Sequence, residues 1–340
     1  MISQPIKNKE VKNLSQLIEE SREVVITCHV KPDGDAVGSS LALYHLLQAL
    51  GKTVSVITPD TPPHYLNFLP GFKDIVVFSS NPNVAIELFE RAGILFSLDY
   101  NAAYRVDKME KTLRDTIATK VMIDHHLDPE PFADIVISHP EMSSTCLLLY
   151  KVICALGLRP LINRETAECL ATGIMTDTGN LSYNANDPDI YIVMSELLRC
   201  GVDKVALWDR LSARSENQLR LNAYALLKKM EVLSKGRAAL ITLTKTELEE
   251  FHYRKGDTEG LVNVPLEMPD VKLSVFMHEE PDFIKVSMRS KGNVPVNEIC
   301  ERHFGGGGHM NAAGGEFRGS MEACVACLKN VLGDYIENSD

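Results

Sequence analysis

The chain has 340 residues, a formal net charge of -11 at pH 7 and 45% hydrophobic residues. That length and apolar content exceed what one domain usually needs, so two domains are expected. The acidic balance argues against a broad basic face for long duplex nucleic acid, whereas a short anionic substrate is still compatible with it.

No apolar run in the sequence is long enough to span a bilayer. The N-terminal stretch MISQPIKNKE is polar where a signal peptide would have its apolar core. Together these two features predict a cytoplasmic protein with no membrane partner.

The first part of the chain alternates expected strands and helices. Residues 23–30 (EVVITCHV) are an expected buried strand, 39–52 (SSLALYHLLQALGK) a helix closed by Gly51, and 53–60 a second strand. Two more short apolar runs follow, separated by a helical or irregular segment. These runs are 93–99 (GILFSLD) and 120–126 (KVMIDHH). The pattern predicts an α/β fold with a doubly wound parallel sheet in the N-terminal domain.

After the first part, the chain is predicted to be mainly helical and then to form short strands. Residues 143–201 look helical apart from an interruption at 173–183 (GIMTDTGNLSY), and 205–233 is expected to be a helical connection. Beyond residue 235, short apolar runs alternate with turns, which favours a smaller C-terminal α/β domain with a mixed sheet and a last helix. The runs are 237–244, 271–279 and 283–290.

Acidic and histidine side chains follow the ends of several expected strands. They are Asp33, Asp35, Asp99, Asp124, His125 and His126. The carboxyl ends of parallel strands share one edge of a sheet, so these groups should converge there. Carboxylates gathered in one cleft, with Asp177 of the TDTG stretch, repel one another unless cations hold them. Mn²⁺ or Mg²⁺ suits such ligands, and two ions sharing a carboxylate would activate water for attack at phosphorus.

Each motif also has a purely structural interpretation. PDGD can be a simple turn, paired histidines can be surface or core residues, and Asp177 can cap a helix. The run Gly305 to Gly308 either presents backbone N–H groups to an anion before a short helix or forms a flexible loop. His309 either donates to a phosphate or base or caps that helix. Arg289 either grips phosphate oxygens or lies on a solvated strand face.

The motifs together resemble the DHH phosphoesterase family with its DHH-associated C-terminal domain. They are HVKPDGDAVGSS, the Asp99 of SLDYN, MIDHH, GIMTDTG and GGGGH, in that order and spacing. The resemblance covers nearly the whole chain and is greatest to the oligoribonuclease and pAp phosphatase branch, the NrnA-like proteins. It implies a DHH catalytic domain over 1–205, a helical linker over 206–233 and a DHH-associated substrate-binding domain over 234–340.

The resemblance also implies roles for single residues. One Mn²⁺ would be held by His29, Asp33 and Asp99. The other would be held by Asp35, Asp99, His125 and Asp177, with Asp99 bridging the two ions. Asp124 would orient the neighbouring histidines, and His126 would contact the scissile phosphate or its leaving oxygen. Gly34 and Gly38 would allow a tight backbone path around the acidic residues.

The part of the nucleotide away from the metals would be gripped by the C-terminal domain, across a cleft between the domains. The residues implied are Arg289, Gly305, Gly306, Gly307, Gly308 and His309. One departure concerns the pattern TDTGxF, in which this chain has Leu181 in place of the aromatic residue. A stacking contact is therefore not expected at that position.

The activity implied is Mn-dependent hydrolysis of very short RNAs (nanoRNA) to mononucleotides and removal of a phosphate from pAp. Linear or cyclic dinucleotides are the alternative substrates. A catalytically silent nucleotide-binding module is the alternative from another functional class. The resemblance also makes a homodimer conceivable.

Overall fold

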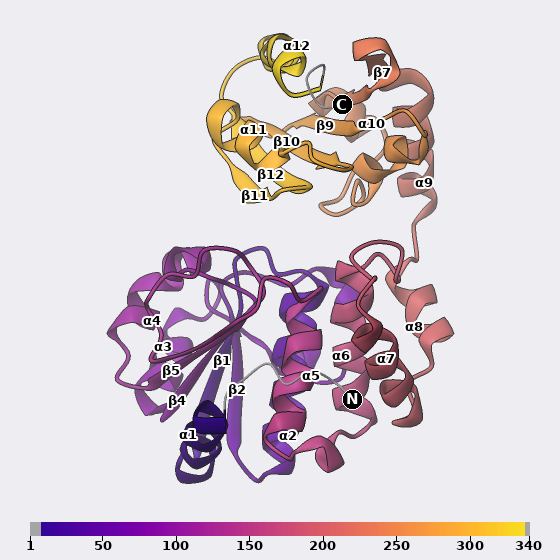
Figure 1. Ribbon diagram of the computed structural model, residues 1–340. Coiled ribbons are helices and arrows are strands. Elements are labelled where there is room, and N and C mark those ends of the chain that lie inside the picture. The colour runs from indigo at the N-terminus through magenta and orange to yellow at the C-terminus, as the bar shows by residue number, and fades with distance from the viewer. Residues whose placement is uncertain (1–7, 337–340) are drawn as a thin grey trace. The chain divides into compact units, whose positions relative to one another are not determined.

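The computed structural model describes residues 8–336. Residues 1–7 of the polar N-terminal stretch and residues 337–340 lie outside the described part. The chain divides into two compact units, Met1–Ala213 and Arg214–Asp340, here called the first and second unit (Figure 1). Within the described residues, no helix combines the length and apolar character needed to cross a membrane.

The first unit is built on a six-stranded parallel sheet. Its strands are β1 (Glu23–Thr27), β2 (Thr53–Thr58), β3 (Val76–Val77), β4 (Ile94–Leu98), β5 (Thr119–Asp124) and β6 (Ile135–Ser138). They lie in the order β3-β2-β1-β4-β5-β6, with every pair parallel. The chain therefore reverses its direction of travel across the sheet between β1 and β4, which is where open α/β sheets bind ligands.

Helices cover both faces of this sheet (Figure 1). Successive strand residues point to opposite faces, so Ile26 and Phe96 join one apolar core while Val25 and Leu95 join the other. The first core is completed by α1 (Asn8–Glu20), α2 (Gly34–Ala49), α5 (Thr145–Ala155), α6 (Arg164–Asp177), α7 (Pro188–Arg199) and α8 (Lys204–Leu211). The second is completed by α3 (Pro82–Arg91) and α4 (Glu110–Asp115). The predicted doubly wound α/β arrangement is confirmed.

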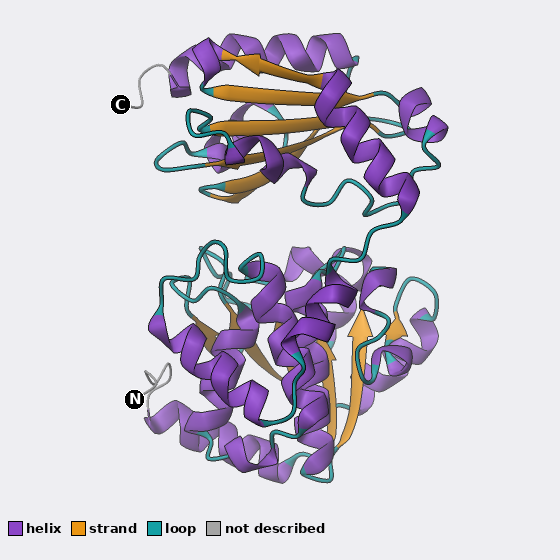
Figure 2. Cartoon of the chain, turned by 90° about the vertical axis from the view of Figure 1, so that its right-hand side faces the viewer, coloured by secondary structure: helices purple, strands orange, loops and turns teal. Residues whose placement is uncertain are grey.

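The second unit contains a mixed sheet (Figure 2). Its strands are β7 (Met230–Leu233), β8 (Ala238–Leu243), β9 (Leu273–Glu279), β10 (Ile284–Ser290), β11 (Gly307–His309) and β12 (Ala312–Phe317). Their order is β11-β12-β10-β9-β8-β7, with β8 and β9 parallel and the other pairs antiparallel. One face packs against α11 (Val296–His303) and α12 (Met321–Ile336), and the other against α9 (Glu216–Tyr224) and α10 (Lys245–Glu250).

The segment 206–233 differs from the expected helical linker. Helix α8 packs in the first unit through Leu207, whereas α9 belongs to the second unit. Leu221 and Ala225 are fully buried against the second sheet, and β7 pairs with β8. Leu207, Leu221 and Ala225 of the expected connecting helix are thus core residues of two separate units.

Glu247 stabilises the start of α10. Its carboxylate accepts hydrogen bonds from Thr244 N (2.9 Å) and the Tyr224 hydroxyl (2.6 Å), and lies 2.9 Å from Lys229 Nζ. Burial alone would raise the pKa of Glu247, but these partners lower it to about 2. A lowered carboxyl pKa adds stability above the group's ordinary pKa, and this stability is lost as the pH falls towards 2.

We expect Glu247→Gln to lower the free energy of unfolding of the second unit by about 1 to 2 kcal/mol at pH 7. The difference from the parent should shrink to a small fraction of its neutral value as the pH falls to 2, where about half of the parent carboxylate is protonated. Hydrogen exchange of β8 and β9 at several pH values measures it. Glu249→Gln is the control, because that exposed carboxylate only approaches Lys245 at 3.9 Å. A loss that is as large at pH 2 as at pH 7, or an equal loss in the control, would contradict the prediction.

Candidate metal centre

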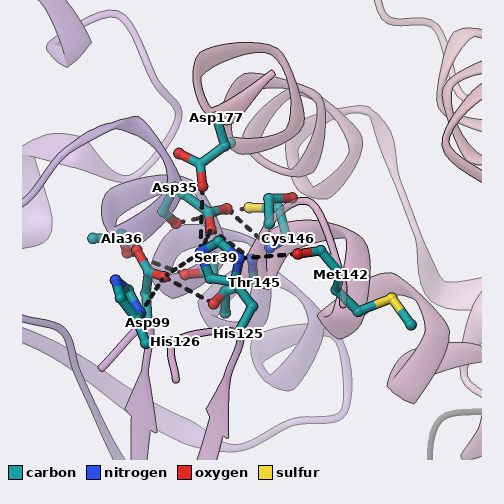
Figure 3. Close-up of polar contacts among 12 residues, drawn as sticks. Asp35, Ala36, Ser39, Asp99, His125, His126, Met142, Thr145, Cys146 and Asp177 are labelled. Carbon is teal, nitrogen blue, oxygen red and sulfur yellow. Dashed lines mark hydrogen bonds and ion pairs between the residues drawn. The ribbon is translucent and has the colours of Figure 1, made fainter. Parts of the chain in front are cut away.

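Polar side chains gather at the carboxyl edge of the first sheet. His29 follows β1, Asp99 follows β4, and Asp124 is the last residue of β5, with His125 next to it. Asp177 comes from elsewhere in the chain, as the last residue of α6. Figure 3 shows Asp35, Asp99, His125, His126 and Asp177 turned toward one another at this edge. The structure therefore brings together side chains from four separate stretches of sequence.

The PDGD motif forms the start of α2. Asp33 is the N-cap residue, and its Oδ1 accepts hydrogen bonds from Asp35 N (3.0 Å) and Ala36 N (3.1 Å). Asp35 lies in the first helical turn and is fully buried. Since a capping carboxylate satisfies backbone N–H groups that have no helical partner, Asp33 both starts the helix and faces the site.

Gly34 and Gly38 have a different role from the expected one. Helix α2 begins at Gly34, five residues before the predicted start, so both glycines are helical rather than part of a tight loop. A Cβ at Gly34 would overlap the Thr176 side chain, and one at Gly38 would lie 2.6 Å from the Cys169 carbonyl oxygen. The glycines allow α2 to approach α6 closely, which brings Asp35 and Asp177 to the same place.

One candidate ligand group lies on the β1 side of the edge. His29 Nε2 is 3.9 Å from Asp33 Oδ1 and 3.5 Å from Asp99 Oδ2. His29 Nδ1 lies 2.8 Å from the Val30 carbonyl oxygen, to which it donates, so Nε2 is the nitrogen that would bind a metal ion once it has lost its proton. One ligand atom from each of the three residues lies within 4.8 Å of the others.

A second group lies around His125. Its Nε2 is 3.9 Å from Asp35 Oδ2, 3.4 Å from Asp177 Oδ2 and 3.5 Å from Asp99 Oδ1. His125 Nδ1 is 3.1 Å from the Met142 carbonyl oxygen, to which it donates, so Nε2 again faces the carboxylates. The ligand atoms of Asp35, His125 and Asp177 also lie within 4.8 Å of one another.

Asp99 lies between the two groups. Its Oδ2 faces His29 and its Oδ1 faces His125, so the two oxygens of one carboxylate point to opposite sides. The side chain is 2% exposed, and the residue has a φ of 64°. A left-handed backbone is uncommon outside glycine but is tolerated by aspartate, and such strain concentrates at functional sites.

Asp124 holds His126 in place. Asp124 Oδ1 accepts a hydrogen bond from His126 Nδ1 (2.7 Å), and Oδ2 accepts one from the His126 backbone N–H (3.0 Å). Asp124 is fully buried, whereas His126 is partly exposed. The pair thus has the geometry of an orienting carboxylate and an oriented imidazole.

The carboxylates carry more negative charge than the nearby histidines balance. Burial, and then the charges of Asp99 and Asp33, raise the pKa of Asp35. Burial and the same acidic neighbours, with Asp35, raise the pKa of Asp177. Burial alone would lower the pKa of His29, but Asp99 and Asp33 raise it to about 9. The site therefore favours additional positive charge.

Asp99 differs electrostatically from its neighbours. Burial alone would raise the pKa of its carboxyl group, but His29, His126 and His125 together lower it. Asp99 is therefore the carboxylate of the site that three imidazoles keep ionised.

The predicted substrate residues lie in the second unit. In the strand register His309 of β11 is opposite Ala312 of β12, which is opposite Arg289 of β10. Directly opposed residues project from the same face of an antiparallel sheet, so the three side chains form one row. His309 and Arg289 are two strands apart, about 10 Å, with only the Ala312 methyl group between them.

The glycine run differs from the expected structure. It follows α11, and Gly307 to His309 form β11, so no helix follows the run. A Cβ at Gly306 would overlap the Gly314 carbonyl oxygen, and one at Gly308 would lie 2.5 Å from the Ala312 carbonyl oxygen. The glycines allow this edge strand to pack closely on β12. A flexible loop, the alternative interpretation of GGGG, would not make this contact.

Sequence reasoning missed the residues that support the ligands from behind. The Met142 carbonyl oxygen, the Thr145 hydroxyl and the Cys146 backbone N–H all contact candidate ligands. The pair of serines in MSSTC before an apolar run is a helix-start signal that predicts the position of α5. It does not predict which side chains the first residues of that helix contact. Leu181, where an aromatic residue was expected, is partly buried against the first core.

Comparison with known proteins covers both units. The model of the DHH family, N-terminal domain, matches residues 23–174, and the DHHA1 domain model matches residues 238–337. A bifunctional oligoribonuclease and PAP phosphatase, NrnA of Thermus thermophilus, is 32% identical over 296 residues, 87% of this chain and 84% of that protein. The cyclic-di-AMP phosphodiesterase GdpP of Bacillus subtilis is 27% identical over 95% of this chain and 49% of its own length.

A solved structure is similar over the full length. The crystal structure of an exopolyphosphatase-related protein from Bacteroides fragilis is 43% identical in sequence, with a TM-score of 0.96. The similarity covers 98% of each chain.

Proposed function

Because the chain belongs to the DHH family, and is thus a hydrolase acting on phosphoester bonds, we propose that it hydrolyses nanoRNA to mononucleotides and converts pAp to AMP with two Mn²⁺ ions. The observation that supports this most directly is Asp99, whose two carboxylate oxygens face two separate ligand groups. The named activities of the Thermus relative supply the substrate class.

The donor set fits two divalent cations. Atoms bound to one such ion at about 2.1 Å, at right angles or wider, are about 3 to 4 Å apart. The separations of 3.4 to 3.9 Å around His29 Nε2 and His125 Nε2 match this spacing. His29, Asp33 and Asp99 would hold one ion, and Asp35, Asp99, His125 and Asp177 the other. Mg²⁺ or another divalent ion suits the same oxygen and nitrogen donors.

When bound, two such ions lower the pKa of water to near neutrality and stabilise negative charge that develops at phosphorus. The chain's own residues supply the rest. Asp124 keeps His126 in one orientation through its two hydrogen bonds, so the imidazole meets the scissile phosphate or the leaving oxygen without first reorganising. The Val30 and Met142 carbonyl oxygens fix the tautomers of His29 and His125.

The second unit would bind the part of the substrate that does not react. Arg289 offers a planar fork for phosphate oxygens, and His309 lies in the same side-chain row. Ala312, which lies between Arg289 and His309 in the strand register, has only a methyl group as its side chain, so it would not obstruct a nucleotide that contacts both residues. The chain has a net charge of -11, and the basic residues proposed to bind substrate in the second unit are only Arg289 and His309. Because long nucleic acids need many basic contacts to phosphate, this charge distribution favours short substrates.

Product analysis tests this function. Purified protein with Mn²⁺ would be given pAp, a diribonucleotide, a five-nucleotide RNA and an RNA of about 24 nucleotides. Mononucleotides from the short RNAs and AMP from pAp are expected, with little product from the long RNA. Full activity on the long RNA without activity on the diribonucleotide would refute the proposal.

Cyclic dinucleotides are the second candidate substrate, because a cyclic-di-AMP phosphodiesterase matches nearly the whole chain. The same assay should include a cyclic dinucleotide, its linear form, pyrophosphate and polyphosphate. Hydrolysis of the cyclic species alone would move the function to the turnover of that signal. Hydrolysis of the linear dinucleotide with the short RNAs supports the first proposal.

Arg289→Ala is expected to raise KM for pAp and the diribonucleotide about tenfold or more, with a much smaller change in kcat. The reason is that its guanidinium would bind a phosphate that does not react, and loss of such uniform binding changes KM. Steady-state kinetics measure both constants. Arg302→Ala, which removes a surface arginine paired with Glu298 on α11, should leave KM unchanged. An unchanged KM in Arg289→Ala would remove Arg289 from the binding site.

A further inference from the structure

The five-residue segment Met142–Cys146 lies directly behind the candidate metal centre and comprises the end of the loop after β6 and the first two residues of α5. Ser144 is the N-cap of α5, and its Oγ accepts a hydrogen bond from Leu147 N (3.0 Å). On one side of this cap the Met142 carbonyl oxygen contacts His125, and on the other Thr145 and Cys146 contact carboxylates. The start of one helix thus reaches three candidate ligands at once.

Thr145 makes two of these contacts (Figure 3). Its backbone N–H donates to Asp35 Oδ2 (2.6 Å), and its hydroxyl donates to Asp99 Oδ1 (2.9 Å). The Cys146 backbone N–H donates to the other oxygen of the same carboxylate, Asp35 Oδ1 (2.9 Å). Thr145 is fully buried, so water does not compete for its hydroxyl. The Asp99 contact is the part of this arrangement that depends on the side chain.

The orientation of the Asp99 carboxylate decides whether it can serve two ions. Rotation about the last side-chain bond of aspartate is soft, so the carboxylate plane is not fixed by the rotamer alone. A donor on Oδ1 limits that rotation and keeps Oδ2 directed towards His29. The donor is uncharged, so it fixes the plane without neutralising the charge that a metal ion needs.

We propose that Thr145 is a positioning residue of the metal centre, whose hydroxyl holds the Asp99 carboxylate in the plane that bridges two ions. This inference rests on the proposed two-metal function, and it goes beyond the ligand set by assigning the bridging geometry to a residue that binds no metal. Thr145→Val removes the hydroxyl at nearly constant shape. Thr145→Ser keeps the hydroxyl and removes only the methyl group.

Mn²⁺ binding without substrate tests the proposal. Titration calorimetry gives stoichiometry and affinity, and electron paramagnetic resonance separates a spin-coupled Mn²⁺ pair from isolated ions. For Thr145→Val we expect affinity for the second Mn²⁺ to fall about 10- to 100-fold and the coupled signal to give way to that of isolated ions. Thr145→Ser should restore both. If the valine variant does not fold, Thr145→Ala is measured in its place, with the same expectation.

Thr172→Val is the matched control. Thr172 is also fully buried, on α6, but its hydroxyl donates only to the Glu168 carbonyl oxygen of its own helix (2.8 Å). The Thr172→Val variant should bind the Mn²⁺ pair with the same affinity as the parent and give the same coupled signal. A coupled pair in Thr145→Val with parental affinity overturns the inference, as does a serine variant as weak as the valine one. A parent protein that binds no Mn²⁺ pair refutes the two-metal function itself, which is a distinguishable result.

Discussion

Asp177→Asn is expected to abolish metal-dependent hydrolysis, with a loss of about a thousandfold or more in kcat. The amide has no charge, and the variant loses one of the carboxylates that face His125 Nε2, at 3.4 Å. Two-metal stabilisation of a phosphoryl transition state contributes several kcal/mol, and each 1.4 kcal/mol corresponds to about tenfold in rate. Initial rates on pAp at saturating Mn²⁺ measure the effect.

The same variant should be at least as stable as the parent when metal is removed with a chelator. The pKa of Asp177 is raised by burial and by Asp35, Asp33 and Asp99, so at neutral pH its ionised form opposes folding. Asp99→Asn provides the contrast, because three histidines lower the pKa of Asp99 and its charge therefore favours folding. In the presence of chelator, the Tm of Asp177→Asn should be equal to or higher than that of the parent, and the Tm of Asp99→Asn should be lower. The reverse order would show that the charge balance of the site is misassigned.

Gly173→Ala is expected to destabilise the first unit and to disrupt the metal centre together. A Cβ at this position of α6 would overlap Cys146 Sγ and lie 2.5 Å from Asp35 Oδ1. Both neighbours are fully buried, so neither can move into solvent. Overpacking of this kind costs about 1 to 3 kcal/mol, which exceeds the gain of up to about 1 kcal/mol from replacing a helical glycine by alanine.

Denaturant unfolding should show this loss of stability, and calorimetry should show weaker Mn²⁺ binding because Asp35 is displaced. Gly333→Ala is the matched control, since it is also a helical glycine but has no atom within 4 Å of the added Cβ. The control should be unchanged or slightly more stable. Parental Mn²⁺ affinity in Gly173→Ala would mean that the site adapts to the added methyl group and that the packing argument is wrong.

The fold and the convergence of the acidic residues were predictable because both depend on local patterns. Apolar runs mark β1, β4 and β5, and parallel strands place the residues that follow them at one edge. The shorter strands were not predicted, since β3 has two residues and β6 four, too few for a period to appear. Asp177 was grouped with the residues at this edge as a further acidic candidate, and the family resemblance added its assignment to the same ion as Asp35 and His125.

The remaining features depend on contacts between distant parts of the chain. Thr145 N donates to an acceptor 110 positions away, and no short motif encodes that pairing. The same holds for Gly38 and Gly306, which look like turn or loop residues in sequence but are required by a neighbouring backbone. The sequence shows only that these positions have no side chain. The structure shows which neighbouring backbone atoms occupy the space that a side chain would need.

The order in which the candidate ligands occur along the chain has a consequence for biosynthesis. They begin at His29 and end at Asp177, the last residue of α6, and β1, β4 and β5 pair only after long crossovers. Such non-local pairing is slow compared with helix formation, and it waits for distant segments to leave the ribosome. A nascent chain that has not yet released α6 lacks Asp177, one of the candidate ligands that face His125. The hydrolysis proposed for this site would therefore begin only after most of the first unit has folded.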